Sequence, residues 1–191
     1  MPYDSQATRD RIMAAATVEF ARHGVAGARI DRIAAAAGAN KRAIYDYFGD
    51  KDALFAAVLE QQLSDCAEAV PVEGGDLGDY AVRLMEYHAA HPEALRLLLW
   101  EALELAGPDP VPAEQVRVDK YAKRAESIAA ANGVAVDDAR VLLFLTIGLV
   151  NWGAAVPQLR GMILGDGYPA DRYRQAIGGA ARALAAGVTR R

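Results

Sequence analysis

Basic and phenolic side chains are concentrated in one short stretch of the chain, and their chemistry suits nucleic acid. They are Lys41, Arg42, Tyr45, Tyr47 and Lys51. Arginine and lysine donate hydrogen bonds to guanine O6 and N7 in the major groove, and they also neutralise phosphates. Tyrosine hydroxyls donate to phosphate oxygens. The alternative is that these charges form the solvated face of an ordinary three-helix unit, because surface Lys and Arg are common.

The pattern around this stretch predicts two short helices joined by a tight turn. The first covers about residues 29–37 and ends at Gly38, which can adopt a positive φ. The second reaches Phe48 and follows Asn40, whose side chain can cap it and leave backbone N–H groups facing a phosphate. The apolar seam between the helices is formed by Ile30, Ile33, Ala34, Ala37 and Ile44. The outer face then carries Lys41, Arg42, Ala43, Asp46 and Tyr47.

Four motifs within about residues 8–60 resemble the DNA-binding region of TetR-family transcriptional repressors. They are Ile12 to Gly24 with Ala16 and Phe20 between them, Ile33-Ala34 followed by Ala37-Gly38, Ile44-Tyr45-Asp46-Tyr47-Phe48, and Lys51 followed by Leu54. The motifs stand in the order that the family has. The resemblance implies a helix-turn-helix at about residues 29–48. It also implies a dimer that presents two recognition helices about 34–36 Å apart to a near-palindromic operator.

The resemblance implies a DNA-binding role for eight residues. They are Arg29, Asn40, Lys41, Arg42, Ala43, Tyr45, Tyr47 and Lys51. Lys41 and Arg42 would meet base edges, a contact worth about 1–3 kcal/mol of discrimination. The two tyrosine hydroxyls would meet phosphates, and Lys51 would clamp a phosphate at the start of the fourth helix.

Three residues depart from the family's common pattern. Arg29 stands where threonine is frequent, and Arg42 replaces a frequent small residue. Asp46 places a negative charge on the outer face. Its carboxylate would either accept from a cytosine amine or pair with Arg42 one helical turn earlier. These departures indicate an operator of the chain's own, whose sequence the residues do not give.

Composition and helix breakers predict an all-α fold of about nine helices. The chain is 53% hydrophobic, much of it alanine, and only 7% aromatic, and no strand-like alternation occurs. We expect an N-terminal three-helix DNA-binding domain at residues 1–50 and a larger helical domain for ligand binding and dimerisation at residues 51–191. Thr8 is expected to cap the first helix. Residues 107–112 are expected to form a proline-rich connection, and a glycine-containing loop around residues 161–167 to precede the last helix.

Charge and cysteine content favour a cytoplasmic protein with a basic N-terminal region. The formal net charge of the 191 residues is −4, but residues 1–51 carry a net charge of +2 and the remainder −6. A basic region on an acidic body orients that region toward phosphates. The single cysteine, Cys66, excludes an internal disulfide framework and a cysteine-based zinc cluster, and it fits a reducing compartment. No signal peptide is recognisable.

The larger domain is expected, from the resemblance, to bind a small-molecule effector and to dimerise through the last two helices. Candidate pocket residues are Tyr80, Leu84, His88, Leu97, Trp100, Tyr121, Phe144 and Trp152, because ligand sites combine an aromatic lining with a few polar groups. Plain core packing is the alternative for each of them. Within the expected helix at residues 137–156, residues 141–152 are apolar nearly all round. This run is shorter than a membrane span and is interrupted by polar residues and glycine, which favours burial in a core or a subunit interface. Gly178 and Gly179 in the last helix would permit close approach of a neighbouring helix.

Two functions other than a ligand-responsive repressor have some support in the sequence. A metal-dependent enzyme would use His88 and His91 with Glu86 or Glu93, but Pro92 interrupts the helix and no further ligand has a suitable spacing. Nucleophile, phosphate-loop and dinucleotide motifs are absent from the sequence. We therefore expect no enzyme activity, no metal and no cofactor. A dimeric DNA-binding protein that responds to no effector remains open.

Overall fold

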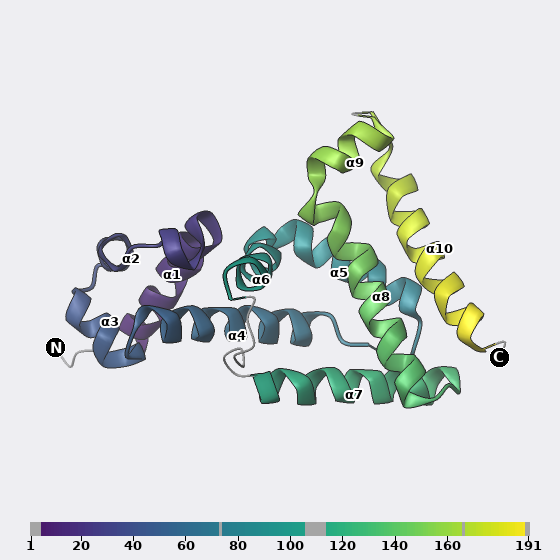
Figure 1. The fold of residues 1–191 in the computed structure, drawn as a ribbon, viewed down its shortest axis with the longest axis horizontal. Coiled ribbons are helices and arrows are strands. Elements are labelled where there is room, and N and C mark those ends of the chain that lie inside the picture. Colours follow the sequence, from purple (N-terminus) through teal and green to yellow (C-terminus); the bar gives the residue numbers. More distant parts are fainter. Residues whose placement is uncertain (1–4, 73, 106–113, 166, 190–191) are drawn as a thin grey trace. The chain divides into compact units, whose positions relative to one another are not determined.

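The structure, a computed structural model, describes residues 5–72, 74–105, 114–165 and 167–189. Over these residues the chain forms ten helices and no strand, which confirms the all-α prediction (Figure 1). The helices are α1 (Ser5–Gly27), α2 (Ile30–Ala37), α3 (Lys41–Phe48), α4 (Lys51–Ala69), α5 (Leu77–Ala90), α6 (Pro92–Glu104), α7 (Glu114–Asn132), α8 (Val136–Ala155), α9 (Pro157–Leu164) and α10 (Ala170–Thr189).

Two expectations about the helices are wrong. Residues 161–164, expected in a loop, belong to α9, which begins at Pro157, where the missing N–H of proline costs nothing. Thr8 does not cap α1, which begins at Ser5; Thr8 is buried within the helix, and its Oγ1 accepts from Arg11 Nη2 at 3.0 Å. Gly24 interrupts α1 with a non-helical backbone, φ 69° and ψ −175°. The expected connection at residues 107–112 lies outside the described residues.

The chain divides into two compact units. The first contains α1–α3, most of α4, and α6. The helix α6 belongs here because it packs on α1: Arg96 Nε and Trp100 Nε1 both donate to the carbonyl of Ala21, at 2.8 and 3.2 Å. The expected boundary at residue 50 therefore falls inside this unit. Its largest fully buried side chains are Ile12, Phe20, Ile33, Ile44, Leu54, Phe55, Leu59 and Leu97.

The second unit contains the end of α4 with α5 and α7–α10. Its core is formed by α5, α7, α8 and α10, with Leu77, Tyr80, Ile128 and Leu142 fully buried. α5 and α10 cross at glycines, since a Cβ at Gly78 would lie 2.6 Å from the carbonyl oxygen of Gly178. Such an approach is open only to a residue without a side chain.

One helix of the second unit, α8, is apolar on more than its buried face. Among the described residues it is the one helix long and apolar enough to cross a membrane, with a mean hydropathy of 1.2 over 18 residues, of which 33% are buried. One such helix is weak evidence for a membrane span. Its inward face packs on α5, α7 and α10 through Ala139, Leu142, Leu143, Thr146 and Val150. Its outward face exposes Val141, Phe144, Leu145 and Trp152.

Candidate nucleic-acid interface

α2 and α3 form the helix-turn-helix that the sequence predicts. Gly38 ends α2 in the left-handed conformation, with φ 60°, and its N–H donates to carbonyls of the last turn. Asn40 then caps α3, and its Oδ1 accepts from the N–H of Ala43 at 2.7 Å. Ile33, Ala34 and Ile44 are buried between the helices and the rest of the unit. The turn thus holds α3 with Lys41 and Arg42 of its first turn exposed.

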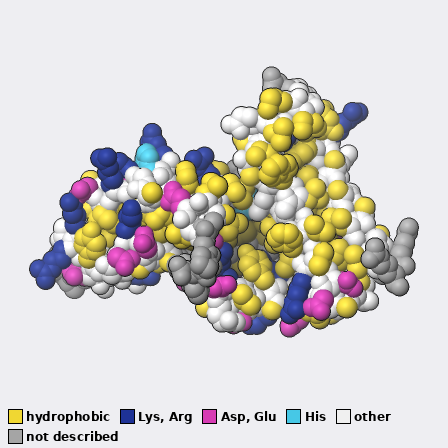
Figure 2. All heavy atoms as spheres, viewed as in Figure 1, with side chains coloured by type: hydrophobic (Ala, Val, Ile, Leu, Met, Phe, Trp, Pro, Cys, Tyr) yellow, Lys and Arg dark blue, Asp and Glu magenta, His cyan; other side chains and the backbone are white. Residues whose placement is uncertain are grey.

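The exposed face of α3 carries two cations, each beside an acidic side chain. Lys41 pairs with Asp31 of α2. Arg42 Nε lies 3.8 Å from Asp46 Oδ2, and both side chains are largely exposed. Of the two roles considered for Asp46, the pair with Arg42 is therefore present in the free chain. Because exposed ion pairs are worth about 0–1 kcal/mol, both cations can exchange these partners for DNA. Lys and Arg side chains are spread over this unit with acidic ones among them (Figure 2).

The other residues expected to contact DNA take different positions. Tyr45 is 47% exposed, and Arg29 and Asn40 are also exposed. Ala43, expected on the outer face, is buried at 9% exposure. Tyr47 is half-buried and packs against the same core. The expected outer face is thus corrected to Lys41, Arg42, Tyr45 and Asp46.

The start of α4 adds a cation beside the helix-turn-helix. Asp50 caps this helix, with its Oδ1 accepting from the N–H of Ala53 at 2.7 Å. Lys51, half-buried, is the first helical residue. A helix N-terminus carries a partial positive charge and free N–H groups, so Lys51 stands where an anion is stabilised.

A buried carboxylate that the sequence did not reveal fixes the start of α2. Glu19 of α1 is 9% exposed, and its Oε1 accepts from the N–H of Arg29 at 2.9 Å and from Arg32 Nε at 2.8 Å. Its Oε2 lies 3.8 Å from His23 Nε2. Burial alone would raise the pKa of the Glu19 carboxyl, but the hydrogen bonds from Arg32 and Arg29 outweigh burial, and the pKa is lowered. Glu19 therefore acts as a charged anchor between α1 and α2.

The residues expected to line a ligand pocket are divided between the two units. Leu97 is fully buried in the core of the first unit, where Trp100 also packs against α1. Tyr80 and Leu84 are buried in the core of the second unit. Burial raises the pKa of the Tyr80 hydroxyl to about 12, an effect that the charge of Arg124 only partly offsets.

The remaining pocket candidates belong to the second unit but do not share one environment. Tyr121 and His88 are half-buried. The pKa of His88 is lowered, mainly by burial and to a smaller extent by the charge of the neighbouring His91. Phe144 and Trp152 are 76% and 62% exposed. The expectation that these two line an interior pocket is corrected, because a helix apolar all round does not show from its sequence which face turns inward.

Among the described residues, the surroundings of His88 and His91 are not those of a metal site. His91 follows the last residue of α5, and its ring lies 4.5 Å from that of Tyr87. In the part of the chain that the structure describes, no three His, Cys, Asp or Glu side chains are placed to hold a metal ion.

Comparisons with known proteins agree with this geometry. Residues 12–58 match the model described as bacterial regulatory proteins, tetR family, and residues 76–182 match the tetracyclin repressor-like C-terminal domain. The chain is 47% identical over 186 residues to the HTH-type transcriptional repressor SCO4008 of Streptomyces coelicolor, covering 95% of this chain and 96% of that one. It is 38% identical over 103 residues to the repressor NicS of Pseudomonas putida, about half of each chain (50% and 49%).

A solved structure resembles the whole chain. The putative transcriptional regulator SCO4942 of Streptomyces coelicolor superposes with a TM-score of 0.78 at 33% identity, covering 93% of this chain and 97% of that one. The matched models and relatives are regulators, which argues against the metal-enzyme alternative. The chain therefore belongs to the TetR family and is a DNA-binding transcriptional regulator with its helix-turn-helix in the first unit.

Proposed function

We propose that the protein is a cytoplasmic homodimeric repressor that binds a near-palindromic operator and leaves it when a small molecule binds the second unit. The observation that carries the DNA-binding half is the exposed face of α3, where Lys41, Arg42 and Tyr45 stand free of the core. The relatives SCO4008 and NicS, both named repressors, support the direction of regulation.

The proposed contacts divide into reading and positioning. Arg42, exposed in the first turn of α3, reads a base edge, because its planar guanidinium can donate twice to guanine. Lys51, at the start of α4, binds a phosphate and contributes no sequence preference. Asp46 restrains Arg42 in the free protein and lowers the freedom lost on binding.

The outward faces of α8 and α10 support the proposed dimer. Figure 2 shows hydrophobic side chains gathered on the second unit. The large hydrophobic side chains that α8 exposes include Phe144 and Trp152. Large exposed apolar patches mark protein interfaces. Gly148 of α8 and Gly179 of α10 each face open space, where a partner helix can approach closely. The helices α8 and α10 correspond to residues 137–156 and to the last helix, the two helices expected from the sequence to form the dimer interface.

Unpartnered polar atoms in the second unit support the proposed ligand response. Thr146 Oγ1 on the fully buried side of α8 has no hydrogen-bond partner among the described residues. The same is true of His88 Nδ1 on α5 and Arg124 Nη2 on α7. Each unsatisfied buried group costs about 1–3 kcal/mol, which a ligand or water with matching groups recovers. The alternative without an effector holds if no compound both stabilises the protein thermally and releases DNA.

Selection of bound DNA from random duplexes tests the proposal. Enrichment of a near-palindromic sequence is expected for the full chain. Arg42→Ala should relax the preference at one base position in each half-site, whereas Lys51→Ala should weaken all sequences alike and lower the salt slope by about 1. Lys123→Ala, an exposed lysine on α7, is the control and should change neither. Failure to enrich any sequence would refute the repressor proposal, and equal effects of Arg42→Ala and Lys51→Ala would refute the division of roles.

A further inference from the structure

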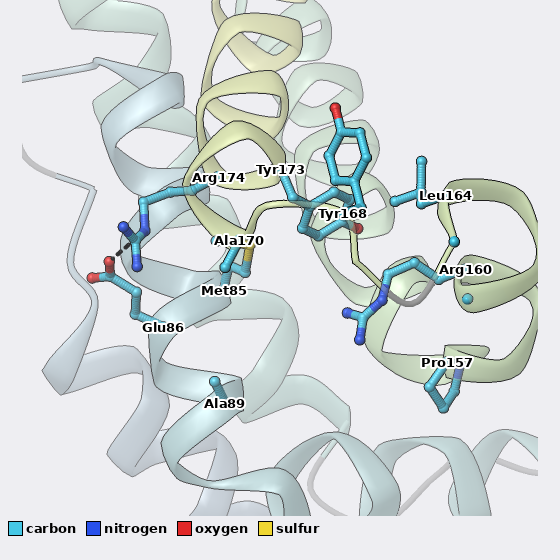
Figure 3. Close-up of a pocket in the computed structure, with 12 residues that line it drawn as sticks. Met85, Glu86, Ala89, Pro157, Arg160, Leu164, Tyr168, Ala170, Tyr173 and Arg174 are labelled. Carbon is cyan, nitrogen blue, oxygen red and sulfur yellow. Dashed lines mark ion pairs between the residues drawn. The ribbon is translucent and has the colours of Figure 1, made fainter.

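A cavity of about 510 Å³ lies between α5, α9 and α10 in the second unit (Figure 3). Its size is typical of sites that enclose a small organic molecule. Most of its wall is apolar. Met85 comes from α5, Leu164 from α9, Tyr168 from the connection between α9 and α10, and Tyr173 from α10. None of the residues expected to bind a ligand lines it. One side of the cavity is formed by α9, a helix that was not expected from the sequence.

The two guanidinium groups at this cavity differ in their partners. Arg174 Nε lies 3.1 Å from Glu86 Oε1, and Arg174 Nη1 lies 2.7 Å from Asp171 Oδ1, so its charge is neutralised twice. Figure 3 shows this pair on one side of Tyr173 and Arg160 on the other. Arg160 has no acidic partner among the described residues. Among the described residues that line the cavity, the uncompensated charge is therefore positive.

Arg160 is held so that its donors stay available. Its guanidinium lies over the ring of Tyr173, 5.6 Å from the centroid. A guanidinium above an aromatic face is attracted by the ring's negative face, and its remaining N–H groups can donate to a carboxylate. Tyr173 is itself fixed, because its hydroxyl packs against the α8 backbone at Gly153, where no Cβ would fit. The cationic donor and the aromatic floor thus form one arranged surface.

We propose that this cavity binds a small aromatic carboxylate. The carboxylate pairs with the N–H edge of Arg160, and the ring lies on the apolar wall formed by Tyr173, Met85 and Leu164. A cationic ligand is disfavoured, since Glu86, the one acidic side chain among the described lining residues, is already paired with Arg174. A neutral aromatic molecule would bury the same apolar area but would leave Arg160 unpaired.

Calorimetric titration of the full chain with 1-naphthoate and 1-naphthamide tests this inference, because the two probes differ in charge and share their ring system. We expect 1-naphthoate to bind at least about fivefold more tightly, the gain of a charge-assisted hydrogen bond at a partly exposed arginine. Arg160→Ala should bring the two affinities within about twofold of each other. Arg172→Ala, an exposed arginine of α10 that does not line the cavity, is the matched control and should keep the preference.

A second variant locates the probe. Ala89 is exposed on α5 and lines the cavity, so Ala89→Trp fills it with little strain on the core and should abolish binding of both probes. The inference is overturned if 1-naphthoate shows no binding, if both probes bind equally to the wild type, or if Arg160→Ala or Ala89→Trp leaves 1-naphthoate binding unchanged. The titration contains no DNA, so each of these outcomes leaves the proposed repressor activity intact.

Discussion

Replacing Glu19 with glutamine tests whether a buried charge holds α2 in place. Glutamine keeps a carbonyl oxygen for the N–H of Arg29 but removes the charge that the Arg32 guanidinium contacts. Hydrogen bonds to charged groups contribute about 1.5–3 kcal/mol, against about 0.5–1.5 kcal/mol for neutral ones. Since the Arg32 side chain is 40% exposed, solvent screens part of this difference. We expect Glu19→Gln to lower the free energy of unfolding by about 1–2 kcal/mol.

The same variant should have a characteristic pH dependence. The pKa of the Glu19 carboxyl is lowered from its ordinary value of 4.5 in the folded protein. Below that ordinary value the unfolded chain binds the proton more readily than the folded one. The stability that the charge provides is therefore complete above about pH 4.5 and is lost as the pH falls through the lowered native pKa. The gap in unfolding free energy between wild type and Glu19→Gln should be largest at neutral pH and narrow below about pH 4.5.

Urea unfolding followed by circular dichroism, at about pH 7 and about pH 4, measures this gap. Asp10→Asn is the control, because Asp10 lies on the same helix but is exposed and, among the described residues, accepts only from Gln6. It should cost less than about 0.5 kcal/mol. A similarly small loss for Glu19→Gln at neutral pH, or a loss that does not change with pH, would refute the role of Glu19 as a charged anchor.

Two further predictions concern the second unit. Gly153→Ala should lower the free energy of unfolding by about 1–3 kcal/mol, because its methyl group overlaps the Tyr173 hydroxyl, whereas Gly187→Ala, which meets no atom within 4 Å, should not destabilise the chain; equal effects in urea unfolding would contradict this. Trp152→Ser should shift the protein from dimer toward monomer in light scattering at low concentration, while Val118→Ser on α7 should not; a Trp152→Ser protein that stays fully dimeric would argue against α8 in the interface.

Local rules predicted the helix-turn-helix well because its determinants are close in sequence. Gly38 ends one helix, Asn40 caps the next, and Asp50 caps the one after, each acting within three or four residues. Ala43 was misplaced because a short helix has few residues to define its faces, and a small apolar side chain fits either side. The helix α9 was missed because Gly161 lies within it, and glycine is read as a loop former.

Contacts between residues far apart in the chain could not be predicted from a single sequence. Glu19 meets Arg29 and Arg32 from another helix, and no periodicity connects these positions. The grouping of α6 with α1 depends on hydrogen bonds that span more than 70 residues, such as Arg96 to Ala21. The exposure of Phe144 and Trp152 could not be predicted for the same reason. In a helix that is apolar all round, the helices packed against it decide which face is buried.

The close contact of α5 and α10 at Gly78 and Gly178 is a point about which the two helices can rotate. Near it, Arg182 Nε pairs with Asp76 Oδ1 at 3.1 Å, so the two helices are pinned at this end. Glu86 lies eight residues beyond Gly78 along α5, a lever arm of about 12 Å at 1.5 Å per residue. A rotation of only about 5° at the glycines therefore moves Glu86 by about 1 Å relative to Arg174. A molecule that enters between these helices at the far end can spread them without disturbing the packed end.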